Sequence, residues 1–232
     1  MDFQGTLFDG EVSGVPAPVD AERTTLTRGA WVECRRNWLP DADDVFATMM
    51  TEVPWRAERR QMYDRVVDVP RLVHTYAVGE TLPHHTLEEA RDALSAHYRP
   101  ILGEPFVTAG CCYYRDGQDS VAWHGDRIGR GRSHDTMVAI VSLGDPRRLA
   151  LRPRREAAAD GETKDSRNLA AELRGRHEPR PRGGGESLSF ELGHGDLLVM
   201  GGSCQRTWEH AVPKVAHAGP RMSVQFRPLN VF

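Results

Sequence analysis

The chain has 232 residues, 39% of them hydrophobic, which is enough for one domain with a substantial core. Its formal net charge is −3, so it lacks the overall positive field of strongly basic proteins, and nucleic-acid binding would need a local basic face. No apolar run approaches the roughly 20 residues of a membrane span, the first residues do not resemble a signal peptide, and the four cysteines show no disulfide framework. We therefore expect a cytoplasmic globular protein with reduced thiols.

The first part of the chain predicts a tail, a strand and a helix. Residues 1–27 are rich in Gly, Pro, Asp and Thr with little periodicity, so we expect a flexible N-terminal tail and then a single domain over 28–232. The segment that follows Ala30 predicts a short strand. An apolar stripe over 41–50 predicts a helix that begins near Asp41.

The next segments predict a ribbon and a second helix. Residues 55–86 hold two runs of strand character joined by turn residues. The run over 86–98 has apolar residues at helical spacing, with Thr86 as the expected N-cap. Pro100 is expected to end this helix, because proline lacks the N–H that a helix interior needs.

From Val107 onward the sequence alternates strands with turns. The run at 136–144 is strongly apolar and bounded by glycine, which is typical of a buried strand. Residues 147–153 alternate charged and apolar side chains, as a half-exposed strand would.

Residues 152–187 interrupt this pattern. They are rich in charged residues, Gly, Ala and Pro and hold few large apolar side chains, so they cannot build a core. We expect a mobile polar insertion between two strands. An arm that contacts nucleic acid and a solvated loop with no specific task are the two alternatives, and the near-balance of positive and negative charges favours the loop.

The last strand-like run, at 221–227, separates polar from apolar side chains, because successive residues of a strand point to opposite faces. One face holds Arg221, Ser223, Gln225 and Arg227, and the other holds Met222, Val224 and Phe226. We expect the polar face to line an internal site, where buried guanidinium groups need bound partners.

His124 and Asp126 form a His-x-Asp pair on one side of an extended strand, so one metal ion can contact both. His210 is the expected third ligand. Two imidazoles and a carboxylate suit Fe(II), whereas thiolates would favour zinc or iron–sulfur sites. Three protein ligands leave coordination positions for a chelating 2-oxoglutarate and for O2. Arg221, downstream of His210, is placed to form a two-pronged salt bridge with the distal carboxylate of 2-oxoglutarate.

A second His-x-Asp pair shows that this motif alone is weak. His194 and Asp196 come directly before an apolar run, so Gly195 predicts a turn into a strand. Few residues remain after it to provide a third His and then an Arg. We expect His124 and Asp126 to be the ligands, and the main alternative is that the chain binds no metal.

Several segments resemble, in order, those of the AlkB family of 2-oxoglutarate- and Fe(II)-dependent nucleic-acid demethylases. They are Y-R-D-G-Q-D-S-V-A-W-H-G-D at 114–126, H-G-D-L-L-V-M-G-G at 194–202, W-E-H-A-V-P-K at 208–214 and P-R-M-S-V-Q-F-R at 220–227. V-P-R-L-V-H-T-Y at 69–76 is similar to the segment before the family's substrate lid. The resemblance implies a mainly β fold with flanking helices (α+β), a double-stranded β-helix of the jelly-roll type.

The resemblance also implies roles for individual residues. His124, Asp126 and His210 would bind the iron. Arg221 would bind the far carboxylate of 2-oxoglutarate, and Tyr114 would hydrogen-bond the same co-substrate. The cofactors implied are Fe(II), 2-oxoglutarate and O2.

Other positions match the family only in part. Arg227 matches its second C-terminal Arg, which lies near the ligating Asp and the inner carboxylate of the co-substrate. Ser223 and Cys112 occupy co-substrate positions that are usually Asn, so two amide donors are missing. Arg127 and Ile128 follow the His-x-Asp pair where the family usually has acidic residues that help to recognise the damaged base. This last difference puts the substrate in doubt and leaves the iron chemistry untouched.

The activity implied is oxidative demethylation of 1-methyladenine and 3-methylcytosine in DNA or RNA, a direct reversal of alkylation damage. An enzyme that acts on a base must take it out of the stack, and 55–86 would form the lid over it. The candidates for substrate contact are Tyr76, Arg71, Trp123, Arg127, His84 and His85. The expected partner is alkylated single- or double-stranded nucleic acid, and we expect a monomer that binds no membrane.

Two alternatives stay open. The same iron chemistry could act on a protein side chain, a modified tRNA or a small molecule, or the barrel could bind nucleic acid without turnover. A basic groove that ends in a base-sized slot at the iron would favour demethylation. An intact cellular phenotype after His124→Ala would favour binding alone.

Overall fold

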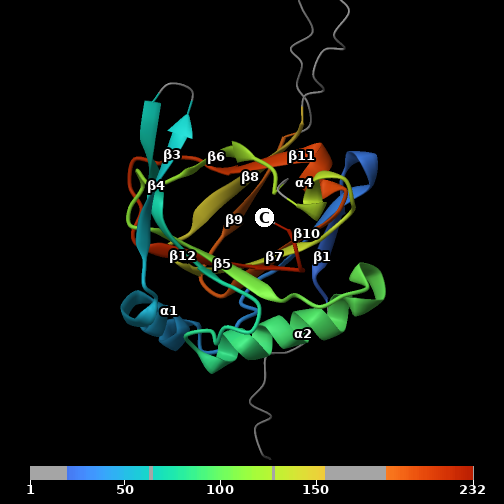
Figure 1. The fold of residues 1–232 in the computed structure, drawn as a ribbon, viewed down its shortest axis with the longest axis horizontal. Helices are drawn as coiled ribbons and strands as arrows, with labels where there is room; N and C mark the ends of the chain where they lie inside the picture. Colours follow the sequence, from blue (N-terminus) through green and yellow to red (C-terminus); the bar gives the residue numbers. More distant parts are fainter. Residues whose placement is uncertain (1–19, 63–64, 127–128, 155–186, 232) are drawn as a thin grey trace, which may run out of the picture.

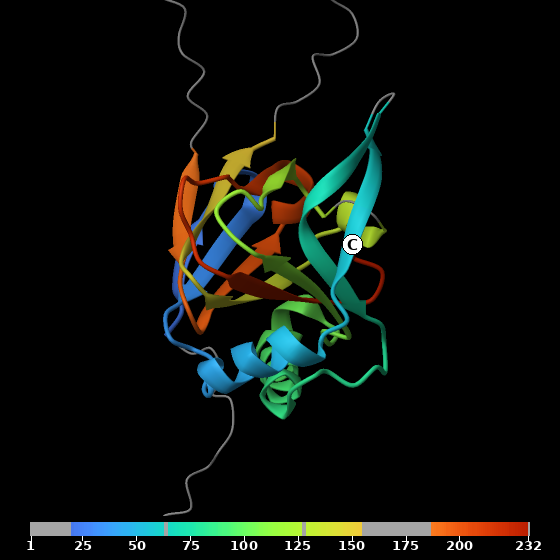
Figure 2. The same cartoon turned by 90° about the vertical axis from the view of Figure 1, so that its left-hand side faces the viewer.

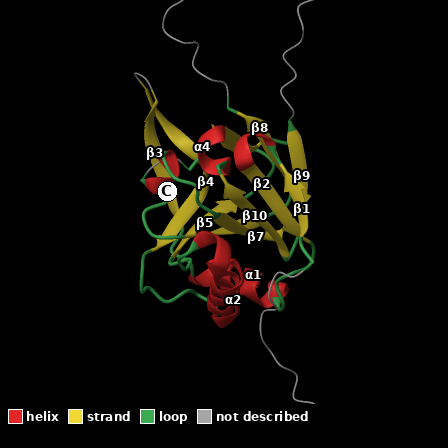
Figure 3. Ribbon diagram, turned by 90° about the vertical axis from the view of Figure 1, so that its right-hand side faces the viewer, coloured by secondary structure: helices red, strands yellow, loops and turns green. Residues whose placement is uncertain are grey.

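The structure is a computed structural model, and it describes residues 20–62, 65–126, 129–154 and 187–231 (Figure 1). Two antiparallel sheets face each other, and two helices cover the outside of the larger sheet (Figures 1 and 3). This is the jelly-roll arrangement with helices on one side that the sequence predicts. In the described part of the chain, no helix is long and apolar enough to cross a membrane.

The two sheets contain twelve described strands. In order across the larger sheet these are β1 (Glu22–Thr25), β2 (Ala30–Arg35), β10 (Asp196–Gly202), β7 (Val138–Gly144), β12 (Arg221–Arg227), β5 (Thr108–Tyr114), β4 (Arg65–Tyr76) and β3 (Arg56–Met62). Across the smaller sheet they are β6 (Val121–His124), β11 (Trp208–Val212), β8 (Arg147–Pro153) and β9 (Leu188–Leu192). A short helix, α4 (Cys204–Thr207), joins β10 to β11. Each sheet therefore combines strands from distant parts of the chain.

Apolar side chains form two layers, one on each face of the larger sheet. In β7, Val138 and Ile140 pack between the two sheets, while Ala139 and Val141 pack on the side of the helices. The whole strand is therefore covered on both faces, which explains the continuous apolar run predicted as a buried strand.

Strand β12 shows the same alternation with polar residues on one face. Met222, Val224 and Phe226 belong to the layer on the helix side. The four polar residues Arg221, Ser223, Gln225 and Arg227 line a pocket between the sheets. The expected internal polar face is confirmed.

The helices are α1 (Ala42–Glu52) and α2 (His85–Leu102), and two details of α2 differ from expectation. The N-cap is His84, whose ring Nδ1 accepts a hydrogen bond from the backbone N–H of Thr86 at 3.2 Å. Pro100 lies inside the helix and does not end it. It falls in the last turn, and Gly103 ends the helix with a left-handed φ of 79°.

The N-terminal boundary also differs. Strand β1 pairs antiparallel with β2, with Arg23 opposite Glu33. The sheet therefore begins before residue 28, and 22–27 are not part of a tail. Polar composition hid this strand, since an edge strand needs few apolar side chains. Residues 1–19 lie outside the described part of the chain.

Strands β3 and β4 form the ribbon expected within 55–86, and they extend beyond the rest of the larger sheet (Figures 1 and 2). Strand β4 also pairs with β5, so the ribbon is continuous with the sheet. The expected insertion at 152–187 lies between paired strands β8 and β9. Its residues 155–186 are outside the described part, and the mobility expected for them stays a prediction.

Candidate metal centre

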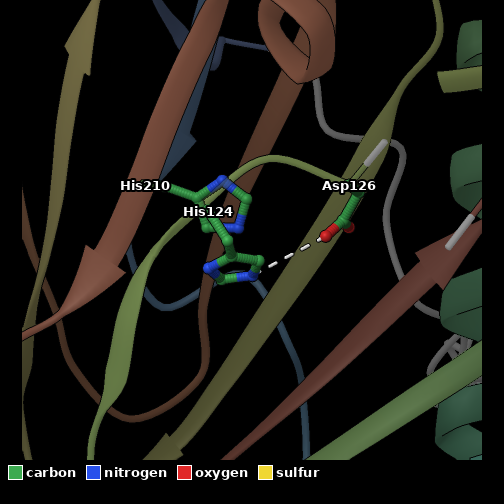
Figure 4. A group of neighbouring side chains, drawn as sticks. All are labelled: His124, Asp126 and His210. Carbon is green, nitrogen blue, oxygen red and sulfur yellow. Dashed lines mark ion pairs between the residues drawn. The ribbon is translucent and has the colours of Figure 1, made fainter. Parts of the chain in front are cut away.

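Three possible metal ligands meet at one end of the smaller sheet (Figure 4). In the pairing of β6 with β11, His124 lies opposite His210, and their ring centres are 4.2 Å apart. Asp126 follows β6 directly, so the chain brings its carboxylate to the same place. One ligand atom from each residue lies within 4.8 Å of the others, and no other such group occurs among the described residues.

Hydrogen bonding and burial prepare both histidines to bind a metal. Nδ1 of His124 lies 2.8 Å from the carbonyl oxygen of Ala122. Because a carbonyl only accepts hydrogen bonds, Nδ1 carries a proton, so Nε2 is the nitrogen whose lone pair can bind a metal. His210 is buried, and its burial together with the nearby His124 lowers its pKa to about 3. It is therefore the neutral imidazole that a metal ion needs.

Asp126 is held as an ionised ligand. Burial alone would raise its pKa, but Arg227 and the two histidines lower the pKa to about 2. Nε and Nη2 of Arg227 both donate to Oδ2 of Asp126 at 2.9 Å. The other carboxylate oxygen, Oδ1, lies 3.7 Å from Nε2 of His124. Arg227 thus orients the carboxylate with one oxygen toward the histidines.

Gln205 is a residue of this centre that the sequence did not reveal. It lies in α4, is buried, and its Oε1 accepts a hydrogen bond from the backbone N–H of Asp126 at 3.1 Å. The helix leads into β11, which carries His210, so Gln205 connects the backbones that hold two of the three ligands. A single Gln belongs to no recognisable sequence motif, so only the tertiary structure shows its contact with Asp126.

A polar pocket adjoins the three ligands, with Arg221 buried in its wall. Nε of Arg221 donates to Oγ of Ser142 at 3.2 Å, and the guanidinium carbon lies 4.9 Å from the ring centre of Tyr114. Nη1 is buried without a hydrogen-bond partner among the described residues. Such a group is costly unless something binds it, so this nitrogen fits a carboxylate ligand.

The other polar residues of the pocket support each other. Nε2 of Gln225 donates to Oγ of Ser223 at 2.6 Å, and Sγ of Cys112 lies 3.9 Å from Oε1 of Gln225. Gln225 therefore brings an amide group to the part of the pocket where Ser223 and Cys112 replace the expected Asn residues. Burial raises the pKa of Tyr114 to about 12, so its hydroxyl stays protonated and can donate a hydrogen bond.

The predicted substrate residues lie in different places. Arg71 lines the pocket, where Nε donates to Sγ of Cys112 at 3.4 Å. Tyr76 does not line the pocket: it is buried in the layer on the helix side of the larger sheet, and we drop it as a stacking candidate. The reason is strand alternation, which sends residues 71 and 76 to opposite faces. His84 caps α2, and its ring stacks on that of His85.

Trp123 does not line the pocket either. Trp123 is 39% exposed and belongs to the outer face of the smaller sheet, opposite His124. Arg127 lies outside the described residues. The second His-x-Asp pair forms the expected turn: Oδ2 of Asp196 accepts from the N–H of Gly193 at 2.8 Å, and the described structure places no metal-type group there.

Two imidazoles and a carboxylate inside a jelly roll define the class of non-haem Fe(II) oxygenases. The chain belongs to the 2OG-Fe(II) oxygenase superfamily, whose family model matches residues 33–227. The cofactors predicted from the sequence, Fe(II), 2-oxoglutarate and O2, are those of this family. The donor set fits the metal, and the unpartnered nitrogen of Arg221 fits the dicarboxylate co-substrate.

The predicted resemblance to AlkB proteins is confirmed by curated relatives. The chain is 30% identical over 207 residues to alpha-ketoglutarate-dependent dioxygenase alkB homolog 3 of Bos taurus, a match that covers 82% of this chain and 62% of the relative. It is 34% identical over 139 residues to DNA oxidative demethylase ALKBH2 of Arabidopsis thaliana, which covers 59% of this chain and 42% of the relative. The chain thus matches about three fifths of the length of the bovine protein.

Solved structures confirm the fold. OsALKBH1 superposes with a TM-score of 0.50 at 14% identity and covers 89% of this chain and 100% of that one. A prolyl-4-hydroxylase of Pseudomonas putida superposes with a TM-score of 0.50 at 16% identity, and the match covers 85% of this chain and 92% of that one. The names of these two proteins differ, so the shared fold does not by itself determine the substrate.

Proposed function

We propose that the chain is an Fe(II)/2-oxoglutarate-dependent dioxygenase that demethylates N-alkylated bases, 1-methyladenine and 3-methylcytosine, in DNA or RNA. One observation carries the oxygenase part: the His–Asp–His group adjoins a pocket in whose wall Nη1 of the buried Arg221 has no hydrogen-bond partner among the described residues. The relatives named alkB homolog 3 and DNA oxidative demethylase support the choice of substrate.

In this proposal His124, Asp126 and His210 hold the iron, and Arg221 and Tyr114 hold 2-oxoglutarate. When bound, the iron and 2-oxoglutarate together activate O2, so that an N-methyl group is hydroxylated and leaves as formaldehyde. Fixing these groups in one geometry is the protein's contribution to the rate.

The surrounding side chains orient the ligands and complete the walls of the pocket. Arg227 holds Asp126 through two hydrogen bonds and leaves one carboxylate oxygen for the metal. Ser223, joined to Gln225, lies on the same polar face as Arg221 and completes the co-substrate pocket. Apolar side chains of the smaller and larger sheets close the rest of the wall, namely Val121, Ile140, Leu149 and Val212.

The direct test is release of succinate and formaldehyde from single-stranded DNA that carries 1-methyladenine or 3-methylcytosine, with Fe(II) and 2-oxoglutarate present. Formaldehyde that depends on the methylated base, and is lost in His124→Ala, would support the demethylase. Succinate without formaldehyde would mean that the same chemistry acts on another substrate. Neither product from a folded, metal-loaded protein would favour a binding protein without turnover.

The remaining proposals concern the setting of this activity. We propose that the substrate is nucleic acid bound near Arg71 and the β3–β4 ribbon, which would act as the lid. A monomeric state and a cytoplasmic location are proposed from the sequence alone. Sedimentation of the purified protein and imaging of the tagged protein in its host would test them.

A further inference from the structure

The outer face of the smaller sheet has a cluster directly behind the metal-binding side chains. Trp123 precedes His124 in β6, and Glu209 precedes His210 in β11. Because successive side chains of a strand point to opposite faces, Trp123 and Glu209 lie on the outside while the two histidines face inward.

Arg152 of β8 connects the two outer residues. Its Nε and Nη2 donate to Oε2 of Glu209 at 3.0 and 2.8 Å. Its guanidinium carbon lies 4.2 Å from the ring centre of Trp123. Strand β11 lies between β6 and β8, so this side chain spans β11 to reach Trp123. We name Trp123, Arg152 and Glu209 the outer-face cluster.

Strand β6 is anchored at its two ends, where Ser120 N–H donates to the Pro70 carbonyl and Asp126 N–H donates to Gln205, but few contacts fix the strand between them. It is four residues long, lies at the edge of its sheet and pairs with β11 alone. Only His124 opposite His210 and Val121 opposite Val212 are in register, with an irregularity between them. The side chain of His124 is 40% exposed, so core packing does not hold its imidazole in place.

We propose that the outer-face cluster positions the metal centre, by holding β6 against β11 so that His124 and His210 keep the separation that one metal ion requires. The inference rests on the proposed function only in assuming that the His–Asp–His group binds a divalent metal. It gives Trp123 a role distinct from substrate contact, and it makes Arg152 and Glu209 positioning residues. A partly exposed ion pair adds little stability, so the effect should appear in metal affinity.

The chain offers a matched control on the larger sheet. Arg23 lies over the ring of Trp31 with the same 4.2 Å spacing, and it pairs with Glu33 at 2.6 Å. This group joins β1 to β2, which hold none of the three proposed ligands. Arg23→Ala therefore removes the same kinds of contact without touching the strands that carry His124 and His210.

The test measures Mn(II) affinity and thermal unfolding of the metal-free full chain by titration calorimetry and calorimetric scanning. Arg152→Ala and Trp123→Ala are each expected to weaken Mn(II) binding about tenfold, as residues that orient metal ligands do. Trp123→Phe keeps an aromatic face and should restore most of the affinity. Arg23→Ala should bind Mn(II) like the wild type, while the unfolding temperatures of Arg23→Ala and Arg152→Ala should be similar.

Wild-type Mn(II) affinity in both Arg152→Ala and Trp123→Ala would overturn the inference. If it came with a raised KM for methylated DNA, it would assign Trp123 to substrate contact. If Arg152→Ala does not fold, Arg152→Lys is the variant to measure, because it keeps the positive charge and loses the two-pronged bond to Glu209. Unchanged Mn(II) affinity in Arg152→Lys would again refute the positioning role. A wild-type chain that binds no Mn(II) would refute the proposed metal site itself.

Discussion

At the scale of single residues, the centre depends on side chains that are charged, buried and aimed at one another. Arg227 donates hydrogen bonds to the carboxylate of Asp126, whereas Nη1 of Arg221 is buried without a hydrogen-bond partner among the described residues. A buried guanidinium N–H group without a hydrogen-bond acceptor is destabilising, so a carboxylate that accepts from Nη1 should bind well.

Arg221→Ala is therefore expected to weaken 2-oxoglutarate binding by more than about 100-fold, the loss that a buried charge-assisted pair implies. Mn(II) affinity should be unchanged, because Arg221 does not contact the His–Asp–His group. Titration calorimetry with each ligand in turn gives both constants. Equal 2-oxoglutarate affinity in mutant and wild type would remove Arg221 from the co-substrate site.

Gln205→Leu tests the link between α4 and the metal ligand Asp126. The change leaves the buried N–H of Asp126 without an acceptor, so the loop that carries the carboxylate should lose its position, and Mn(II) affinity should fall about tenfold. Gln118→Leu, a change to an exposed amide, is the control. Equal affinities in the two variants would show that Gln205 does not orient the ligand.

At the scale of elements, the helices matter because they brace the sheet that carries Arg221 and Arg227. Tyr98 of α2 donates to Oε2 of Glu33 in β2 at 2.5 Å, and burial together with this bond raises the pKa of the tyrosine. This contact joins α2 to β2 of the larger sheet.

Tyr98→Phe should reduce the free energy of unfolding by about 1–3 kcal/mol, because the buried carboxylate of Glu33 loses a donor. Arg23 still pairs with Glu33 at 2.6 Å, so the loss should stay within that range. Urea unfolding measures it. Mn(II) affinity should not change; a parallel loss of metal binding would mean that α2 controls the site directly.

The segment between β8 and β9 gives a second prediction for an element. Leu151 pairs with Leu188, so the ends of the segment are neighbours and a short turn can join them. Deletion of 156–183 should leave demethylation of a short methylated oligonucleotide intact. Failure of the shortened protein to fold would show that the segment is structural, and activity lost only on long DNA would favour a nucleic-acid arm.

Some elements and site residues could be predicted from the sequence and others could not, and the difference has physical reasons. Strand β7 was predicted from its continuous apolar run and β12 from its alternation, because both patterns are local to the strand. The N-cap of α2 was wrong because it depends on the ring of His84, and β1 was missed because its stability comes from pairing with β2. Tyr76 was misplaced because a ribbon pattern does not reveal which face meets the pocket. Gln205 and Arg152 act through contacts between distant segments, which no motif records.

At the scale of the whole molecule, the site joins the two sheets: Arg221 and Arg227 come from the larger, His124 and His210 from the smaller. Ligands that bridge them should stabilise the fold. Mn(II) with 2-oxoglutarate at about 100 times their dissociation constants should add about 2.7 kcal/mol for each ligand that binds only the native state. Calorimetric scanning of the wild type should show an upward shift of the unfolding temperature with each addition. Arg221→Ala should respond to Mn(II) alone, and an unmoved unfolding temperature in the wild type would contradict a shared site.

Strand β12 carries an arginine at each end, both on the same face. From residue 221 to residue 227 a strand advances about 20 Å, and its pairing with β5 and β7 on both sides prevents it from stretching or sliding. Arg227 holds the ligand Asp126, and the same rigid strand fixes the position of Arg221 relative to that ligand. In the proposed function, the separation of the three metal ligands from Nη1 of Arg221 would then limit the length of a dicarboxylic acid that reaches both. We therefore expect oxaloacetate, which is one carbon shorter, and 2-oxoadipate, which is one carbon longer, to bind less well than 2-oxoglutarate.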